Sequence, residues 1–149
     1  MGDLTGVIEG VHLTPLSRLD GPDGSVLHGL KASDPLFNGF GEAYFSSVRG
    51  GAVKPWRRHF RMRLNLMVPA GSVRFVLFDD RRGSRTHRAF MEVVLSADEN
   101  YQRLTVAPGI WMAFQGRTEG LNLVMNLADL EHDPSESERR ELHELPYPW

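Results

Sequence analysis

The clearest chemical pattern in the chain is a run from Gly51 to Gly71 that has the spacing of a metal-binding pair of strands. Within this run, the three positions expected to carry ligands hold Arg57, His59 and Leu64. Residues two apart in a β-strand point to the same face, so the side chains of Arg57 and His59 are expected to share one pocket. One imidazole is therefore left where three metal ligands would stand.

A second pattern farther along the chain would complete such a site. It is a Pro108-Gly109 turn followed by a ligand position, which here holds Met112. A single imidazole among Arg, Leu and Met side chains lacks the three or four nitrogen and oxygen ligands that a divalent cation needs. The sequence therefore predicts no bound metal in this pocket, and we expect no cofactor.

The elements that must position these residues are strands. From residue 41 onward, short apolar and β-branched runs alternate with Gly, Pro, Asp and Asn, which predicts strands joined by turns. Seven such runs are present: 43–48, 63–68, 73–78, 90–95, 103–106, 111–114 and 121–127. Seven short strands at this spacing indicate an antiparallel all-β sandwich or barrel. Together with the two motifs, they are typical of a double-stranded β-helix, the cupin jelly roll.

We predict a single domain with three parts. Residues 1–40 form an N-terminal arm of short strands and turns, 41–127 form the barrel, and 128–149 form a charged tail. The Asp133-Pro134-Ser135 segment is expected to begin one short helix in that tail, and the aromatic residues at its end are expected to pack onto the barrel.

Composition excludes several classes of protein. A chain of 149 residues that is 41% hydrophobic is sufficient for one core. Its 17 Lys and Arg residues against 19 Asp and Glu give a net charge of -2, which does not favour a nucleic-acid partner. Cysteine is absent, so thiolate chemistry and disulfides are excluded. No apolar run is long enough for a membrane span, and with no export signal we expect a cytoplasmic protein.

The order and spacing of several segments resemble the sugar-nucleotide cupins around dTDP-4-dehydrorhamnose 3,5-epimerase. The resemblance runs from about Ser25 to Trp149, and its strongest segments are 41–48, 54–62, 73–86, 107–115 and 146–149. It implies a metal-free jelly roll, usually dimeric, that binds a nucleotide-diphosphate hexose with a 4-keto group. The family moves protons at the carbons beside that ketone.

The resemblance also shows where this chain departs from the family. The family's base is a histidine, and the matching position holds Arg57, which stays protonated and cannot act as a base. We expect His59, on the same face, to take that role, as in related ketoisomerases that carry a second histidine. Tyr44 on an earlier strand is the candidate proton donor. A family lysine has no clear counterpart, since Leu64 stands at its position.

The remaining candidate residues are assigned to substrate binding. Lys54, Arg57 and Arg63 are the cations expected to hold the diphosphate, and Trp111 and Met112 are expected to line the pocket. Each assignment has an alternative: a surface position for the arginines and a packed core position for the aromatic residues and the histidine.

Two functions therefore stay open. The first is a sugar-nucleotide epimerase or ketoisomerase that acts on a dTDP-4-keto-6-deoxyhexose through His59. The second is a non-catalytic or divergent cupin that binds an anionic small molecule. In either case, the exposed sheet edges and the N-terminal arm favour a homodimer.

Overall fold

The computed structural model of the protein describes residues 7–149 and contains two five-stranded antiparallel sheets that face each other, with a separate two-stranded hairpin. The predicted all-β class is confirmed. The seven predicted strands of the barrel are also confirmed, each to within two residues at either end.

The first sheet has the strand order β1-β9-β6-β11-β4. Its strands are β1 (Val11–Pro15), β9 (Gln102–Val106), β6 (Leu64–Ala70), β11 (Leu123–Ala128) and β4 (Glu42–Ser47). The second sheet has the order β12-β5-β10-β7-β8. Its strands are β12 (Ser137–Arg139), β5 (Val53–His59), β10 (Ile110–Gly116), β7 (Ser72–Asp79) and β8 (Phe90–Ser96).

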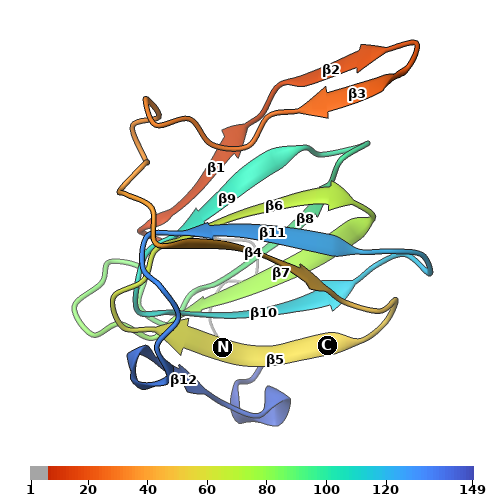
Figure 1. Cartoon of the computed structure of the whole chain (residues 1–149). Helices are drawn as coiled ribbons and strands as arrows, with labels where there is room; N and C mark the ends of the chain where they lie inside the picture. Colours follow the sequence, from red (N-terminus) through yellow and green to blue (C-terminus); the bar gives the residue numbers. More distant parts are fainter. Residues whose placement is uncertain (1–6) are drawn as a thin grey trace.

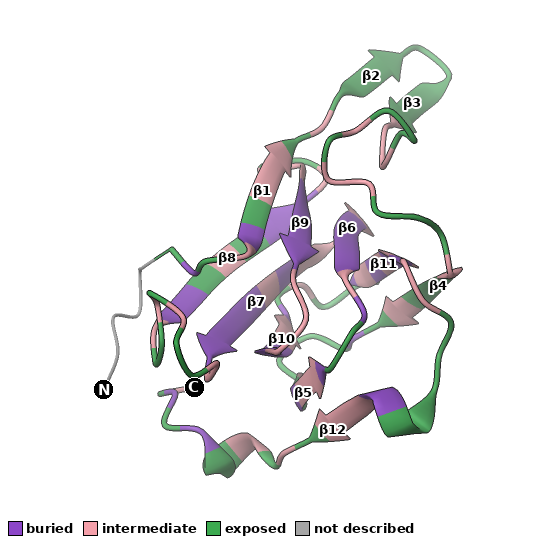
Figure 2. Ribbon diagram, turned by 90° about the vertical axis from the view of Figure 1, so that its left-hand side faces the viewer, coloured by how far each residue is buried: buried purple, intermediate pink, exposed green. Residues whose placement is uncertain are grey.

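The main core lies between the two sheets. Alternate residues of β6 and β7, among them Leu66, Val68 and Phe75, point into it and are almost fully buried. A second core lies on the outer face of the second sheet, where Trp56 and Trp111 are fully buried. Strand β7 consequently lies between two apolar layers and is buried along most of its length (Figure 2).

The second core is covered by the C-terminal tail, whose Leu145 and Tyr147 are buried in it. The expected packing of the tail onto the barrel is confirmed, but the expected helix is wrong. The tail forms two single 3₁₀ turns, Pro134–Glu136 and Leu142–Glu144, with strand β12 between them. A short helix in this segment would have a costly nucleus, whereas β12 gains backbone hydrogen bonds by pairing with the edge of β5.

The N-terminal region has two distinct parts. Strand β1 pairs with β9 and is part of the first sheet rather than of a separate arm. The hairpin of β2 (Arg18–Gly21) and β3 (Gly24–Leu27) projects away from the sheets (Figure 1). Across residues 7–149, the structure contains no helix long and apolar enough to span a membrane.

Candidate active site

A cavity of about 420 Å³ lies between the two sheets and is lined by residues of both. Its apolar wall is formed by Leu64, Leu66, Met112, Phe114 and Val124. The polar groups come mainly from β4, the edge strand of the first sheet, and from β5 and the edge strand β12 of the second sheet. Substrate in such a cavity would be shielded from water on the apolar side and would meet ionisable groups on the other.

Strand β5 places three ionisable side chains on the cavity, namely Lys54, Arg57 and His59. Simple alternation would put Lys54 on the opposite face from the other two. The register between β5 and β10 shifts, however, because Met112 is opposite Arg57 whereas Phe114 is opposite Lys54. The extra residue in β5 is a β-bulge, and it turns Lys54 toward the same cavity.

The imidazole of His59 is held by a buried carboxylate. Its Nδ1 lies 2.7 Å from Oε1 of Glu136, and both side chains are almost fully buried. The other oxygen of Glu136 accepts hydrogen bonds from the backbone N–H groups of Arg61 and Met62, at 2.7 and 2.9 Å. Glu136 is therefore fixed at both oxygens, and it fixes the orientation of the His59 ring in turn.

The environment of Glu136 keeps it ionised. Burial alone would raise the pKa of this carboxyl, but the hydrogen bonds from Arg61, His59 and Met62 outweigh burial and hold the pKa below its usual range. An ionised Glu136 accepts, so Nδ1 of His59 carries the hydrogen, and in the neutral imidazole the lone pair therefore lies on Nε2. That arrangement is the one a general base requires.

Tyr44 lies across the cavity on β4 and is partly exposed to it. Its hydroxyl oxygen accepts a hydrogen bond of 3.0 Å from Nδ2 of Asn126, a buried residue of β11. Because Asn126 occupies the acceptor side of the hydroxyl, the proton of Tyr44 is free to point to a bound molecule. Tyr44 is thus suited to donate a hydrogen bond or a proton.

Two arginines face each other at the edge of the cavity. Arg57 on β5 and Arg139 on β12 are directly opposite partners in the sheet, and both line the cavity. Partial burial lowers the pKa of the Arg57 guanidinium, and the positive charge of Arg139 lowers it further. Both remain cations at neutral pH, so this side of the cavity attracts anions.

Two residues expected at the site lie elsewhere. Trp111 is fully buried in the second core, where the guanidinium carbons of Arg58 and Arg140 lie 4.9 and 4.6 Å from its ring centre. Since Met112 faces the cavity, strand alternation puts its neighbour Trp111 on the opposite face. Arg63 precedes β6 and donates to the carbonyl of Leu36, at 3.2 Å. The assignment of both residues to the pocket is therefore wrong.

The polar residues of the site that were missed from the sequence are Glu136, Arg139, Asn126 and Ser46. Glu136 and Arg139 belong to the charged tail, where neither spacing nor composition separates them from the other charged residues. Asn126 did carry a signal, since it is a polar residue inside an apolar strand. A buried polar residue at such a position usually has a specific partner.

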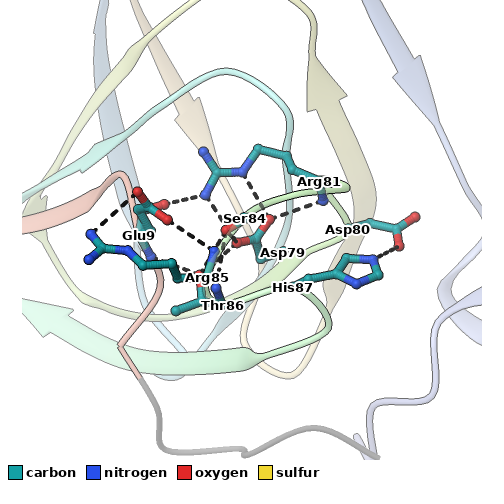
Figure 3. Close-up of polar contacts among 8 residues, drawn as sticks. All are labelled: Glu9, Asp79, Asp80, Arg81, Ser84, Arg85, Thr86 and His87. Atoms are coloured by element: carbon teal, nitrogen blue, oxygen red, sulfur yellow. Dashed lines mark hydrogen bonds and ion pairs between the residues drawn. The ribbon is translucent and has the colours of Figure 1, made fainter.

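The backbone of His59 is anchored through a neighbouring network. Its carbonyl accepts a 2.7 Å hydrogen bond from the N–H of Gly109, in the turn before β10. The side chain of Arg81 lies against this turn, so that a side chain at Gly109 would meet it at 3.0 Å. Arg81 is held in turn by the buried carboxylate of Asp79, to which its Nε and Nη2 donate at 2.9 and 3.0 Å (Figure 3).

The carboxylate of Asp79 is the centre of this network. It also accepts from the hydroxyls of Ser84 and Thr86, at 2.6 and 2.7 Å. Burial alone would raise the pKa of Asp79, but these hydrogen bonds and those from Arg81 hold the pKa far below its usual range. The loop after β7 is thereby fixed against the turn that supports His59.

The described part of the chain, residues 7–149, holds no group of three or more His, Asp and Glu side chains that could bind a metal ion. The polar groups of the cavity include the imidazole of His59, the hydroxyl of Tyr44 and a set of cations. Such a set can remove a proton from a carbon acid and bind an anionic substrate.

Solved structures with this fold were found by comparison. The chain is similar to the dTDP sugar isomerase from Desulfovibrio desulfuricans G20, with 36% identity over 95% of this chain and 92% of the other, and a TM-score of 0.92. NovW, a 4-keto-6-deoxy sugar epimerase from Streptomyces spheroides, shares the fold at 20% identity, over 93% of this chain and 75% of the other, with a TM-score of 0.79.

A third similar structure is ChmJ, a 3'-monoepimerase from Streptomyces bikiniensis that was solved in complex with dTDP. It is 17% identical over 99% of this chain and 78% of the other, with a TM-score of 0.82. No protein-family model matches the chain, and no curated protein does.

Proposed function

Because this chain belongs to the family of dTDP-sugar isomerases and epimerases related to dTDP-4-dehydrorhamnose 3,5-epimerase, we propose that it is a metal-independent epimerase or ketoisomerase. Its substrate is a dTDP-4-keto-6-deoxyhexose. The observation that carries the proposal is the His59–Glu136 pair, which aims a base into a cavity rich in cations.

The reaction begins with a proton on the carbon beside the ketone. Nε2 of His59 takes this proton, the C–H electron pair becomes the carbon–carbon double bond, and the negative charge moves to the former carbonyl oxygen. Glu136 stabilises the imidazolium that forms, because its carboxylate stays ionised against Nδ1. Return of a proton to the other face of the carbon completes an epimerisation. In a ketoisomerisation the proton returns instead to the former carbonyl carbon, the hydroxyl on the deprotonated carbon loses its proton and becomes the new carbonyl, and the former carbonyl oxygen takes up a proton and becomes a hydroxyl.

Tyr44 is the proposed proton donor. It lines the cavity from the opposite sheet, and its own proton is not used by Asn126. Two groups on opposite walls of one cavity suit a reaction in which a proton is removed on one face and returned on the other. His59 and Tyr44 therefore have the arrangement that an epimerisation requires.

Cations of the cavity, Lys54 and Arg139 among them, hold the diphosphate in this proposal. Lys54, Arg57 and Arg139 all line the cavity, and arginine matches phosphate oxygens with two parallel hydrogen bonds. The wall of Leu66, Met112 and its neighbours suits the less polar parts of a deoxy sugar.

Solvent-deuterium exchange tests the proposal. The native protein should incorporate deuterium from D₂O beside the ketone of dTDP-4-keto-6-deoxyglucose, as read by NMR or mass spectrometry. His59→Gln should slow this exchange by about 10²- to 10⁴-fold, the usual contribution of a general base. His143→Gln, a change at an exposed histidine of the tail, is the matched control and should leave the rate unchanged.

The outcomes separate the two functions left open by the sequence. No exchange in the native protein, with several dTDP-4-keto sugars, would favour a cupin that only binds an anionic molecule. Exchange that is equal in the native protein and in His59→Gln would remove His59 from the mechanism.

We also propose a homodimer. Leu19 and Val26 are cross-strand partners in the projecting hairpin of β2 and β3, and each side chain is 58% exposed. A two-stranded hairpin alone is only marginally stable in water, and its base is tied to the barrel through Arg18 and Asp98, at 2.7 Å. A second copy of the chain that covers this apolar pair would explain why the hairpin is ordered.

A further inference from the structure

The two faces of the β5 and β12 strand pair carry opposite patterns of charge. On the outer face, Arg58 lies opposite Glu138 and forms an ion pair with it. On the cavity face, Arg57 lies opposite Arg139. Within residues 7–149, neither of these two side chains forms an ion pair with a carboxylate. Like charges directly opposite each other destabilise a sheet. Repulsion between Arg57 and Arg139 therefore lowers the stability of the folded protein on the cavity face, whereas the Arg58–Glu138 pair on the outer face is attractive.

The two arginines differ in their depth. Arg139 is exposed at the rim, whereas Arg57 is about half-buried beside Met112. A partly desolvated cation interacts more strongly with an anion than an exposed one does. The lowered pKa of Arg57 reflects the same desolvation and the nearby charge of Arg139. The inner position is thus the stronger electrostatic site.

Arg57 is also the cation beside the base. It is two residues from His59 on one strand face, which puts the two Cα atoms about 7 Å apart. Tyr44 is close enough to interact electrostatically with Arg57. The base, the guanidinium and the hydroxyl therefore converge on one region of the cavity, while Lys54 lies farther along β5 beyond the bulge.

Resting on the function proposed above, we propose that Arg57 is a catalytic residue that binds the keto oxygen of the sugar and stabilises the enolate. When His59 takes the proton, the electron pair that is released places its charge on that oxygen. The guanidinium of Arg57 donates hydrogen bonds to it and stays protonated throughout, so the proton balance involves only His59 and the group that returns the proton. Arg139 and Lys54 are left to bind the diphosphate.

Separate measurements of catalysis and of diphosphate binding test this division. The first is deuterium exchange at saturating dTDP-4-keto-6-deoxyglucose, and the second is the affinity for dTDP, which lacks the sugar, by calorimetry. Arg57→Gln should slow the saturated exchange by about 10²- to 10³-fold, as loss of an oxyanion donor does, with little change in dTDP affinity. Arg139→Gln should instead weaken dTDP binding by about tenfold or more.

Two controls keep the result interpretable. Arg57→Lys keeps the charge but not the planar fork, so it should retain more exchange than Arg57→Gln. Arg58→Gln makes the same change one residue on, at the outer face, and should leave the saturated exchange unchanged. Arg57→Gln is expected to fold, since it relieves the repulsion from Arg139, and its Tm should be no lower than that of the native protein.

Three results would overturn the inference. If Arg57→Gln exchanges at the native rate when saturated but binds dTDP at least tenfold more weakly, Arg57 is a diphosphate ligand. If it changes neither quantity, Arg57 has no role in the site. Absence of exchange in the native protein contradicts the proposed function itself, and the role of Arg57 falls with it, whereas the first two results leave that function standing.

Discussion

Glu136 holds the ring of His59 through a 2.7 Å hydrogen bond from a position 77 residues farther along the chain. The same carboxylate accepts from the backbone of Arg61 and Met62 just beyond β5. One buried side chain thus sets both the orientation of the His59 imidazole and the course of the chain after β5. The carboxylate partner of His59 is supplied by the tail rather than by a barrel strand.

Replacement of Glu136 tests this positioning role. Glu136→Gln should slow deuterium exchange at least about tenfold, because an orienting carboxylate fixes the tautomer of a histidine base and stabilises its charged form. Glu138→Gln, two residues on and partly exposed on the outer face, is the matched control and should keep the exchange rate. An unchanged rate in Glu136→Gln would show that the carboxylate does not support the base.

Asp79 is expected to contribute strongly to stability. Asp79→Asn should lower the free energy of unfolding by about 2–4 kcal/mol at pH 7, because it removes the charge to which Arg81, Ser84 and Thr86 donate. Urea denaturation measures this difference. Asp80→Asn, whose partner His87 lies 3.6 Å away at the surface, should change stability by less than about 1 kcal/mol.

The difference in stability between the native protein and Asp79→Asn should decrease as the pH falls. The pKa of Asp79 is lowered in the folded state, so its contribution is fully present above its ordinary value of 3.8 and is lost as the pH falls below it. The gap in stability between native protein and Asp79→Asn should therefore be constant near neutral pH and shrink in acid below about pH 4. A gap that stays constant down to pH 2 would contradict this account.

The tail is expected to be anchored by Tyr147. Its ring is buried and lies 5.8 Å from that of Phe90 and 4.7 Å from that of Trp149, measured between ring centres. Tyr147→Ala should cost about 3 kcal/mol of unfolding free energy, as loss of a buried aromatic side chain does. Tyr147→Phe keeps the ring and should cost about 1 kcal/mol or less. Equal losses in the two variants would place the stabilisation in the hydroxyl.

The hairpin of β2 and β3 is expected to hold the dimer together. Light scattering should give twice the mass of the chain at micromolar concentration for the native protein. Val26→Asp should shift it toward the monomer, because it puts a charge into the apolar pair with Leu19. Asp23→Asn, in the turn of the same hairpin, should remain a dimer. A native monomer would exclude the proposed assembly.

Local pattern was sufficient for the strands but not for the tail. Strands such as β7 and β10 carry apolar runs bounded by turn residues, and these signals are local. The segment after Asp133 has a signal for a helix start, yet its backbone pairs with β5, a partner about 80 residues away. Pairing with β5 outweighed the local preference for a helix. The residues near Asp133 do not indicate that β5 is the partner, so the strand could not be predicted from them.

The site could be predicted where two residues share a strand. Arg57 and His59 were predicted together because alternation puts them on one face, and both line the cavity. Lys54 reaches the same cavity only through the bulge, which alternation does not reveal. Trp111 was expected to line the pocket together with Met112, but neighbouring residues of a strand face opposite ways, and Trp111 is buried in the second core.

The C-terminal tail supplies Glu136 to the site, and the nascent chain lacks this residue until the tail is made. Strands β4, β5, β6, β10 and β11, which line the cavity, all precede Glu136 in the sequence, so the ribosome completes them while His59 still lacks its carboxylate partner. In the proposed mechanism, a partly synthesised chain therefore lacks the carboxylate that orients the imidazole of His59, and proton transfer at the full rate requires that the tail has been made and has docked along β5.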